Sequence, residues 1–240
     1  MNPLHQFDIQ TIFPLSLGGI DISFTNSALF MLLAVFISVF GLWAALCRHQ
    51  LIPTGAQAIA ERLYKFIDIT AKDTIGSGYQ PYLPFLFSVF IFILAGNLLG
   101  LIPMGFTFTS QLAPIGAFAL LGLLISSGIG IYLHHWKWFR TFLPSGMPVI
   151  LAPLVIPIEL ISVMAKPFSL TIRLVMNMVV GHLLLQIMAY FTTISGLAAV
   201  FPFAFIVLMT LFELGIAFLQ AYIYTVLTSI YLGEAVHLHG

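Results

Sequence analysis

The chain alternates long hydrophobic runs with short polar clusters. Asp, Glu, Lys and Arg are absent from four runs, at residues 22–47, 74–136, 174–212 and 214–233. A helix needs about 20 apolar residues to cross a hydrocarbon core of ~30 Å. The first run therefore predicts a spanning helix at 26–46. Pro103 interrupts the second run, which predicts a hairpin of two spanning helices at 82–104 and 112–134.

The C-terminal half contains two longer apolar stretches, at 147–191 and 197–235. At 1.5 Å per residue each stretch would form a helix of roughly 60 Å, about twice the hydrocarbon thickness. Such helices have to be strongly tilted or broken. Pro157 and Pro167 offer bend points in the first stretch. We therefore expect a hairpin of two long, steeply inclined helices.

Residues 54–75 show a different periodicity, with charged residues on one side of a helix. The charged side consists of Glu61, Lys65, Asp68 and Lys72, and the apolar side of Ile59, Leu63, Phe66 and Ile67. This pattern predicts an amphipathic helix at the membrane interface. The whole pattern predicts an all-α integral membrane protein, with residues 1–240 forming a single polytopic domain.

Composition supports a membrane protein and excludes other classes. Of 240 residues, 60% are hydrophobic and 7% are charged, far fewer charges than a soluble domain carries. Eight basic and eight acidic residues cancel, so no net field favours nucleic acid. The single cysteine, Cys47, excludes an internal disulfide and a cysteine-framed metal site. We expect no metal and no cofactor.

The distribution of Lys and Arg predicts an orientation. Basic residues occur after the first expected span (Arg48, Arg62, Lys65 and Lys72) and after the third (Lys137 and Arg140), whereas the N-terminal segment has none. Because basic loops stay on the cytoplasmic side, we expect the N-terminus outside and the C-terminus inside. Residues 1–19 also lack the basic region of a cleaved signal peptide.

Four ionisable residues interrupt the C-terminal apolar hairpin: Glu159, Lys166, Arg173 and Glu213. Each charge costs at least ~2.5–3.5 kcal/mol at the bilayer centre, so intramembrane charges indicate function. Glu159, Lys166 and Arg173 recur every seven residues, and Asn177 follows one turn later. At about 100° per residue these four side chains share a narrow face. Lys166 could pair with Glu159 or extend toward the inner interface.

The second long helix carries its own polar face. Glu213, Gln220 and Tyr224 recur on one side, next to small residues that allow helices to approach closely. On the first long helix, His182 and Gln186 lie roughly opposite Arg173. His182 is either a buried structural residue or, facing Glu213, part of a proton relay. Asn97, in the earlier hairpin, is a candidate for a hydrogen bond between helices.

Several motifs resemble subunit a of the F-type ATP synthases. They are residues 156–162 (IPIELIS), 166–174 (KPFSLTIRL) and 219–227 (LQAYIYTVL), together with Asn177 and the Gly181-His182 pair. The match extends over nearly the whole chain. The combination of His182 with Glu213 is similar to the alphaproteobacterial and mitochondrial branch. Departures from the usual pattern are Val175-Met176, Gly233-Glu234 and the loop at 134–139.

The resemblance implies a non-catalytic, proton-conducting stator subunit of the Fo sector. Its implied partners are the c-ring, subunit b of the peripheral stalk and the remaining FoF1 subunits, in a bacterial inner membrane or alternatively a mitochondrial one. Arg173 would separate two offset half-channels. His182, Glu213 and Asn177 would line the outer one and Glu159 the inner one, with Gln220 and Tyr224 as polar support and Lys166 and Gln186 nearby.

Other functions remain open from the residues alone. A small secondary transporter could use Arg173 to bind an anionic substrate, although no internal repeat of the kind found in transporters is visible. An electron-transfer subunit with quinone or haem is another alternative, although no pair of histidines is placed on facing spans in a way that suggests haem ligation. A purely structural anchor would leave the polar faces of the hairpin unexplained.

Overall fold

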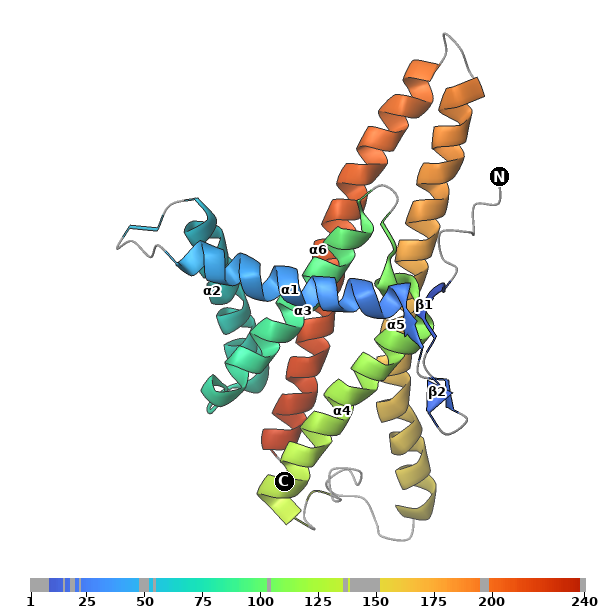
Figure 1. The fold of residues 1–240 in the computed structure, drawn as a ribbon. Helices are drawn as coiled ribbons and strands as arrows, with labels where there is room; N and C mark the ends of the chain where they lie inside the picture. Colours follow the sequence, from blue (N-terminus) through green and yellow to red (C-terminus); the bar gives the residue numbers. More distant parts are fainter. Residues whose placement is uncertain are drawn as a thin grey trace.

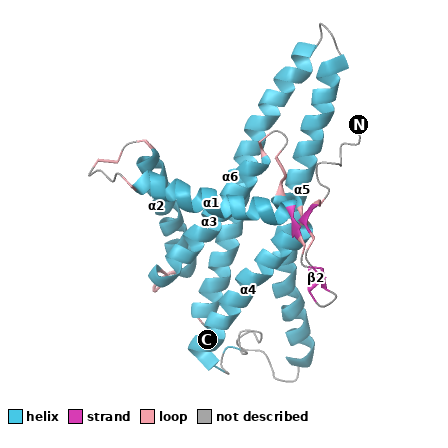
Figure 2. Cartoon of the chain, in the orientation of Figure 1, coloured by secondary structure: helices cyan, strands magenta, loops and turns pink. Residues whose placement is uncertain are grey.

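The computed structural model describes residues 9–14, 16–17, 20–21, 23–47, 52–53, 55–102, 105–135, 138, 152–194 and 199–237. Within these ranges the chain is dominated by helices, drawn in cyan in Figure 2, and the predicted all-α class is confirmed. Five helical segments are long and apolar enough to cross a membrane. Parts of the expected segments, at 54, 103–104, 147–151 and 197–198, lie outside the described residues.

The N-terminal segment forms two short antiparallel ladders that the hydrophobic pattern does not predict. Strand β1 (Thr11–Phe13) pairs with β4 (Phe24–Thr25), and β2 (Ser16–Leu17) pairs with β3 (Ile20–Asp21). Helix α1 (Asn26–Leu46) follows directly, because the Thr25 hydroxyl accepts a hydrogen bond from the backbone of Ala28 at 3.4 Å and caps the helix.

Helix α2 (Ala56–Ile75) packs against the following helices through its apolar side. Ile67 and Ala71 are buried, and the Phe66 ring contacts Phe90 of α3 and Tyr222 of α6. Ile59, expected on the same apolar side, is 63% exposed. A single helical turn, η2 (Gln80–Tyr82), connects α2 to α3 (Leu83–Gly100). Helix α3 ends before the expected residue 104, and the chain then folds back through η3 (Phe108–Ser110).

The remaining helices are α4 (Leu112–His134) and the long pair α5 (Ala152–Ile194) and α6 (Val200–Val236). With 43 and 37 residues, α5 and α6 are about 65 and 55 Å long. Helix α5 continues through Pro157 and Pro167. Figure 1 shows the hairpin extending beyond the other helices, with α1 crossing it at a steep angle. Because α1 and the hairpin point in such different directions, they cannot have the same tilt relative to a membrane.

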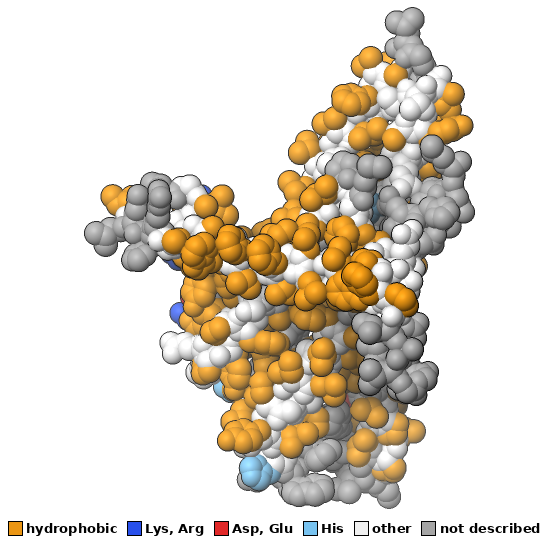
Figure 3. All heavy atoms as spheres, viewed as in Figure 1, with side chains coloured by type: hydrophobic (Ala, Val, Ile, Leu, Met, Phe, Trp, Pro, Cys, Tyr) orange, Lys and Arg blue, Asp and Glu red, His pale blue; other side chains and the backbone are white. Residues whose placement is uncertain are grey.

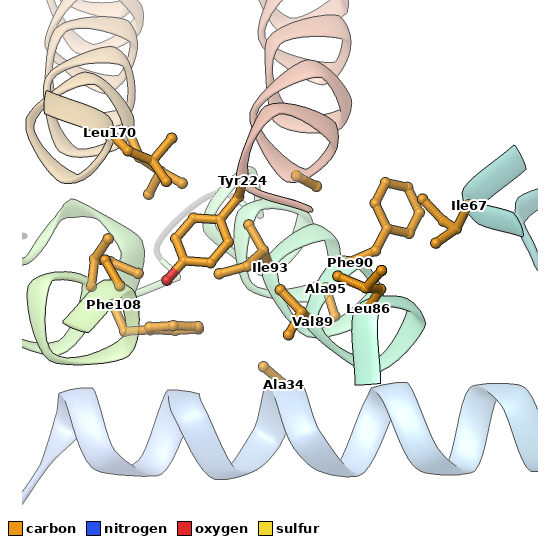
Figure 4. Packing of buried hydrophobic residues seen from close by; sticks show 14 of the residues in the cluster. Ala34, Ile67, Leu86, Val89, Phe90, Ile93, Ala95, Phe108, Leu170 and Tyr224 are labelled. Carbon is orange, nitrogen blue, oxygen red and sulfur yellow. The ribbon is translucent and has the colours of Figure 1, made fainter. Parts of the chain in front are cut away.

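The core lies where α3, α4 and the lower parts of α5 and α6 meet. In Figure 4 the Tyr224 ring of α6 lies within this cluster, with Leu170 of α5, Ile93 of α3 and Phe108 around it. The upper part of the hairpin has few neighbours, and large apolar side chains such as Phe201 and Leu208 are exposed there. The face drawn in Figure 3 is correspondingly dominated by hydrophobic side chains.

Candidate functional site

Helices α5 and α6 are in close contact at Gly181 and Glu213. A Cβ atom built on Gly181 would overlap Oε1 of Glu213 and stand only 2.9 Å from its Cδ. Glu213 is 7% exposed, and neither of its carboxylate oxygens has a hydrogen-bond partner among the described residues. The absence of a side chain at position 181 thus allows a buried carboxylate to lie directly against the backbone of α5.

Asn97 of α3 joins the same region from a third helix. It is fully buried, and its Nδ2 donates a hydrogen bond of 3.1 Å to the carbonyl oxygen of Ala217, one turn after Glu213. The expected interhelical hydrogen bond is therefore present. The side-chain oxygen of Asn97 has no partner among the described residues. This oxygen is an acceptor close to the turn of α6 that carries Glu213.

The polar face of α6 continues away from Glu213 toward the C-terminus. Gln220 and Tyr224 are 3% and 2% exposed, and neither Oε1 of Gln220 nor the hydroxyl of Tyr224 has a described partner. Buried polar groups in proteins are nearly always hydrogen-bonded, and an unmet one costs about 1–3 kcal/mol. Buried water molecules commonly satisfy groups of this kind, so these positions on α6 are places where water can enter the packed core.

His182 directly follows Gly181 on α5 and is half-buried. Its Nε2 is 3.3 Å from the hydroxyl oxygen of Thr107, in the segment between α3 and α4. Glu213 contacts the α5 backbone one residue earlier, at Gly181, so the carboxylate and the imidazole belong to the same part of the helix crossing. Gln186 is half-buried one turn further along α5. Thr107 was not identified from the sequence, where it is one of several hydroxyl residues in a turn.

Arg173 has a different environment on α5. It is exposed, although Leu170 and Leu174 on either side are buried against the other helices. Of the α5 residues one turn away, Ser169 and Met176 are exposed and Asn177 is half-buried. Among the described residues, no acidic side chain lies within salt-bridge distance of Arg173. Arg173 is therefore a cation on the exposed side of α5.

Among the remaining polar residues of α5, Lys166 has a partner that the sequence did not predict. Lys166 forms an ion pair with Glu234 of α6 at 3.3 Å and lies over the ring of Tyr231. Pairing with Glu159 was one of two alternatives for Lys166 and is not observed, because the carboxylate within salt-bridge distance belongs to Glu234, near the C-terminal end of α6. Glu159 and Asn177 are half-buried at the edge of the exposed face. The described residues contain no group of three or more side chains suited to a metal ion.

These features define an α-helical membrane protein in which two long helices enclose a buried polar row beside an exposed cation. Comparison with known proteins agrees. A family model described as ATP synthase A chain matches residues 28–233. The chain is 42% identical to ATP synthase subunit a of Rhodospirillum rubrum over 239 residues, covering 99% of both chains. It is 43% identical to ATP synthase subunit a of Agrobacterium fabrum over 245 residues, covering 98% of both.

The chain therefore belongs to the ATP synthase A chain family. Among its relatives is also ATP synthase subunit a of Paramagnetospirillum magneticum, 42% identical over 245 residues, with 99% of each chain covered. Family membership over nearly the full length, with several helices able to span a bilayer, identifies an inner-membrane multi-pass protein. It also removes the support for a secondary transporter.

Proposed function

We propose that this chain conducts protons to and from the carboxylates of a rotating c-ring through two half-channels separated by Arg173. The general role follows from the family, whose members are proton-translocating stator subunits of the Fo sector of ATP synthase. In this proposal the chain itself catalyses no bond chemistry, and ATP is made by other subunits. The c-ring and subunit b of the peripheral stalk are the neighbours that it would contact.

The exposure of Arg173 is the observation that carries the proposal. A guanidinium group keeps its proton at every accessible pH, and in lipid it requires an anionic neighbour. No described residue of the chain supplies that neighbour. A carboxylate on an adjoining rotor would satisfy the charge, and the low dielectric constant of lipid would strengthen the attraction. At about 4 Å and an effective dielectric constant of ~20, such a pair is worth about 4 kcal/mol.

That attraction explains how the cation could direct proton flow. A rotor carboxylate that reaches Arg173 is held in its ionised form and has to release its proton first. After it has passed Arg173 it can take up another proton. If the two sides of Arg173 open to opposite faces of the membrane, each proton that crosses turns the rotor by one step and uses ~2.3 kcal/mol per 100 mV of membrane potential.

The buried polar groups near the crossing of α5 and α6 support the proposed outer half-channel. Glu213 and His182 are titratable groups at the crossing of α5 and α6, and Asn97 and Gln220 add buried acceptors beside them. Because these acceptors have no hydrogen-bond partner within the described part of the chain, water can bridge them and carry protons between the titratable groups. We assign Asn177 to the outer half-channel with His182 and Glu213, and Glu159, on the other side of Arg173 along α5, to the inner half-channel.

The test is ATP-driven proton pumping by the assembled ATP synthase in inverted membrane vesicles. We expect Arg173→Ala to abolish coupled pumping while the subunit still inserts and assembles, because about 4 kcal/mol corresponds to almost a thousandfold in equilibrium. The control is Met176→Ala, which shortens an exposed side chain one turn away on the same face and should pump normally. Full coupled pumping by Arg173→Ala would overturn the proposal.

A further inference from the structure

The segment between α3 and α4 lies directly on the backbone of α3. A Cβ atom on Gly96 would stand 2.5 Å from the Phe108 ring, and one on Gly100 would stand 2.5 Å from Cγ2 of Thr107. The two glycines are one helical turn apart. Because neither has a side chain, the segment packs directly against the backbone of α3 at both positions. This contact determines the position of Thr107.

Thr107 occupies a buried place between two polar groups. Its side chain is 2% exposed, and Oγ1 is 3.5 Å from the carbonyl oxygen of Gly100 and 3.3 Å from Nε2 of His182. A hydroxyl group has one proton to donate and two lone pairs to accept with. The carbonyl of Gly100 can only accept. The hydroxyl of Thr107 can therefore accept a hydrogen bond from Nε2 of His182 when that nitrogen is protonated, and donate one to it when it is not.

We propose that Thr107 is a positioning residue that holds the His182 ring in one orientation in both of its protonation states. When Nε2 carries a proton, it donates to Oγ1, and the hydroxyl proton of Thr107 turns to the Gly100 carbonyl. When Nε2 carries none, the hydroxyl donates to Nε2 instead. Thr107 keeps its own proton throughout, and the relayed proton passes only between His182 and the path. The inference rests on the role proposed above for His182.

The same segment provides a matched control. Thr109 is fully buried two residues later, but its hydroxyl has no hydrogen-bond partner among the described residues. Valine has the shape of threonine without the hydroxyl group. Thr107→Val and Thr109→Val therefore remove equally buried hydroxyls from one loop, and only the first of them removes a contact with His182. If these hydroxyls mattered only through their burial, the two variants would conduct protons equally; Thr107→Val removes the hydrogen bonds to both His182 and the Gly100 carbonyl.

The experiment measures passive proton conduction in membrane vesicles stripped of F1, normalised to the amount of assembled Fo. We expect Thr107→Val to conduct about tenfold more slowly, the size of effect that one hydrogen bond to a charged group produces. Thr109→Val should stay within about twofold of the unsubstituted protein, and Thr107→Ser, which keeps the hydroxyl, should conduct nearly normally. Equal conduction by Thr107→Val and Thr109→Val would overturn the inference.

A second pair of variants covers a failure of Thr107→Val to assemble. Thr107→Ala and Thr107→Ser differ only by the hydroxyl, so a slow alanine variant beside a normal serine variant supports the inference, and equal rates overturn it. His182→Gln separates the two proposals. Normal conduction by His182→Gln would remove His182 from the proposed path, whereas slow conduction by His182→Gln with normal conduction by Thr107→Val would remove only the role of Thr107.

Discussion

Gly181 offers a direct test of how closely the carboxylate of Glu213 has to be placed. Alanine at position 181 would put a methyl group onto Oε1 of Glu213 and within 2.9 Å of its Cδ, so the side chain has to rotate or the two helices have to separate. Overpacking of this kind costs typically about 1–3 kcal/mol. The contact is with the far end of a flexible side chain, which can rotate away more easily than backbone can move. We therefore expect Gly181→Ala to assemble, but with a displaced carboxylate.

Proton conduction should reveal the displacement, because proton transfer requires hydrogen-bond distances. We expect Gly181→Ala to conduct at least about tenfold more slowly in stripped vesicles. Adding Glu213→Asp shortens the side chain by one methylene and should recover part of the rate. The control is Gly215→Ala on α6, where an added Cβ would meet nothing within 4 Å. Unimpaired conduction by Gly181→Ala, or a double variant slower than both single ones, would refute this account of the helix crossing.

Two further predictions concern charged residues of the hairpin. Glu213→Gln should slow ATP-driven pumping, because an amide cannot carry the proton, and His182→Glu in the same chain should restore part of it; unchanged pumping by Glu213→Gln would contradict this role. Lys166→Gln and Glu234→Gln, analysed as a double-mutant cycle by thermal unfolding of the purified complex, should give a coupling of at most about 1 kcal/mol, because the side chains are 37% and 39% exposed. A coupling above about 2 kcal/mol would indicate a buried network instead.

The hydrophobic pattern was sufficient to predict the fold class, because long apolar runs without charges can only be helices in lipid. The membrane crossing of each individual segment stays a prediction. The N-terminal β-ladders could not be predicted from the hydrophobic pattern, because their strands are two or three residues long and are stabilised by backbone pairing. That pairing is continued by Asn26, whose N–H donates to the carbonyl of Gln10 at 3.0 Å. A hydrogen bond of this kind carries no signature in side-chain hydrophobicity.

Some residues of the candidate site could be predicted from the sequence, and others could not. Charges within apolar runs are visible in any sequence, so Arg173 and Glu213 were identified before the structure, although their roles remain proposals. Partners that come from distant parts of the chain were not identified. Thr107 meets His182 across 75 positions, and Lys166 meets Glu234 across 68. Helical periodicity relates neighbours on one helix and therefore suggested Glu159, whereas the true partner depends on where α6 ends.

The exposed guanidinium of Arg173 also bears on how the subunit is made. Before it meets a rotor, the newly inserted chain presents a cation to lipid, at a cost of at least ~2.5–3.5 kcal/mol on insertion scales. That penalty is comparable with a sizeable part of the stability of many folded proteins. Under the proposed function, an unassembled copy would carry that cost until it docked onto an acidic neighbour, so the residue that would drive rotation would also favour assembly of the complex.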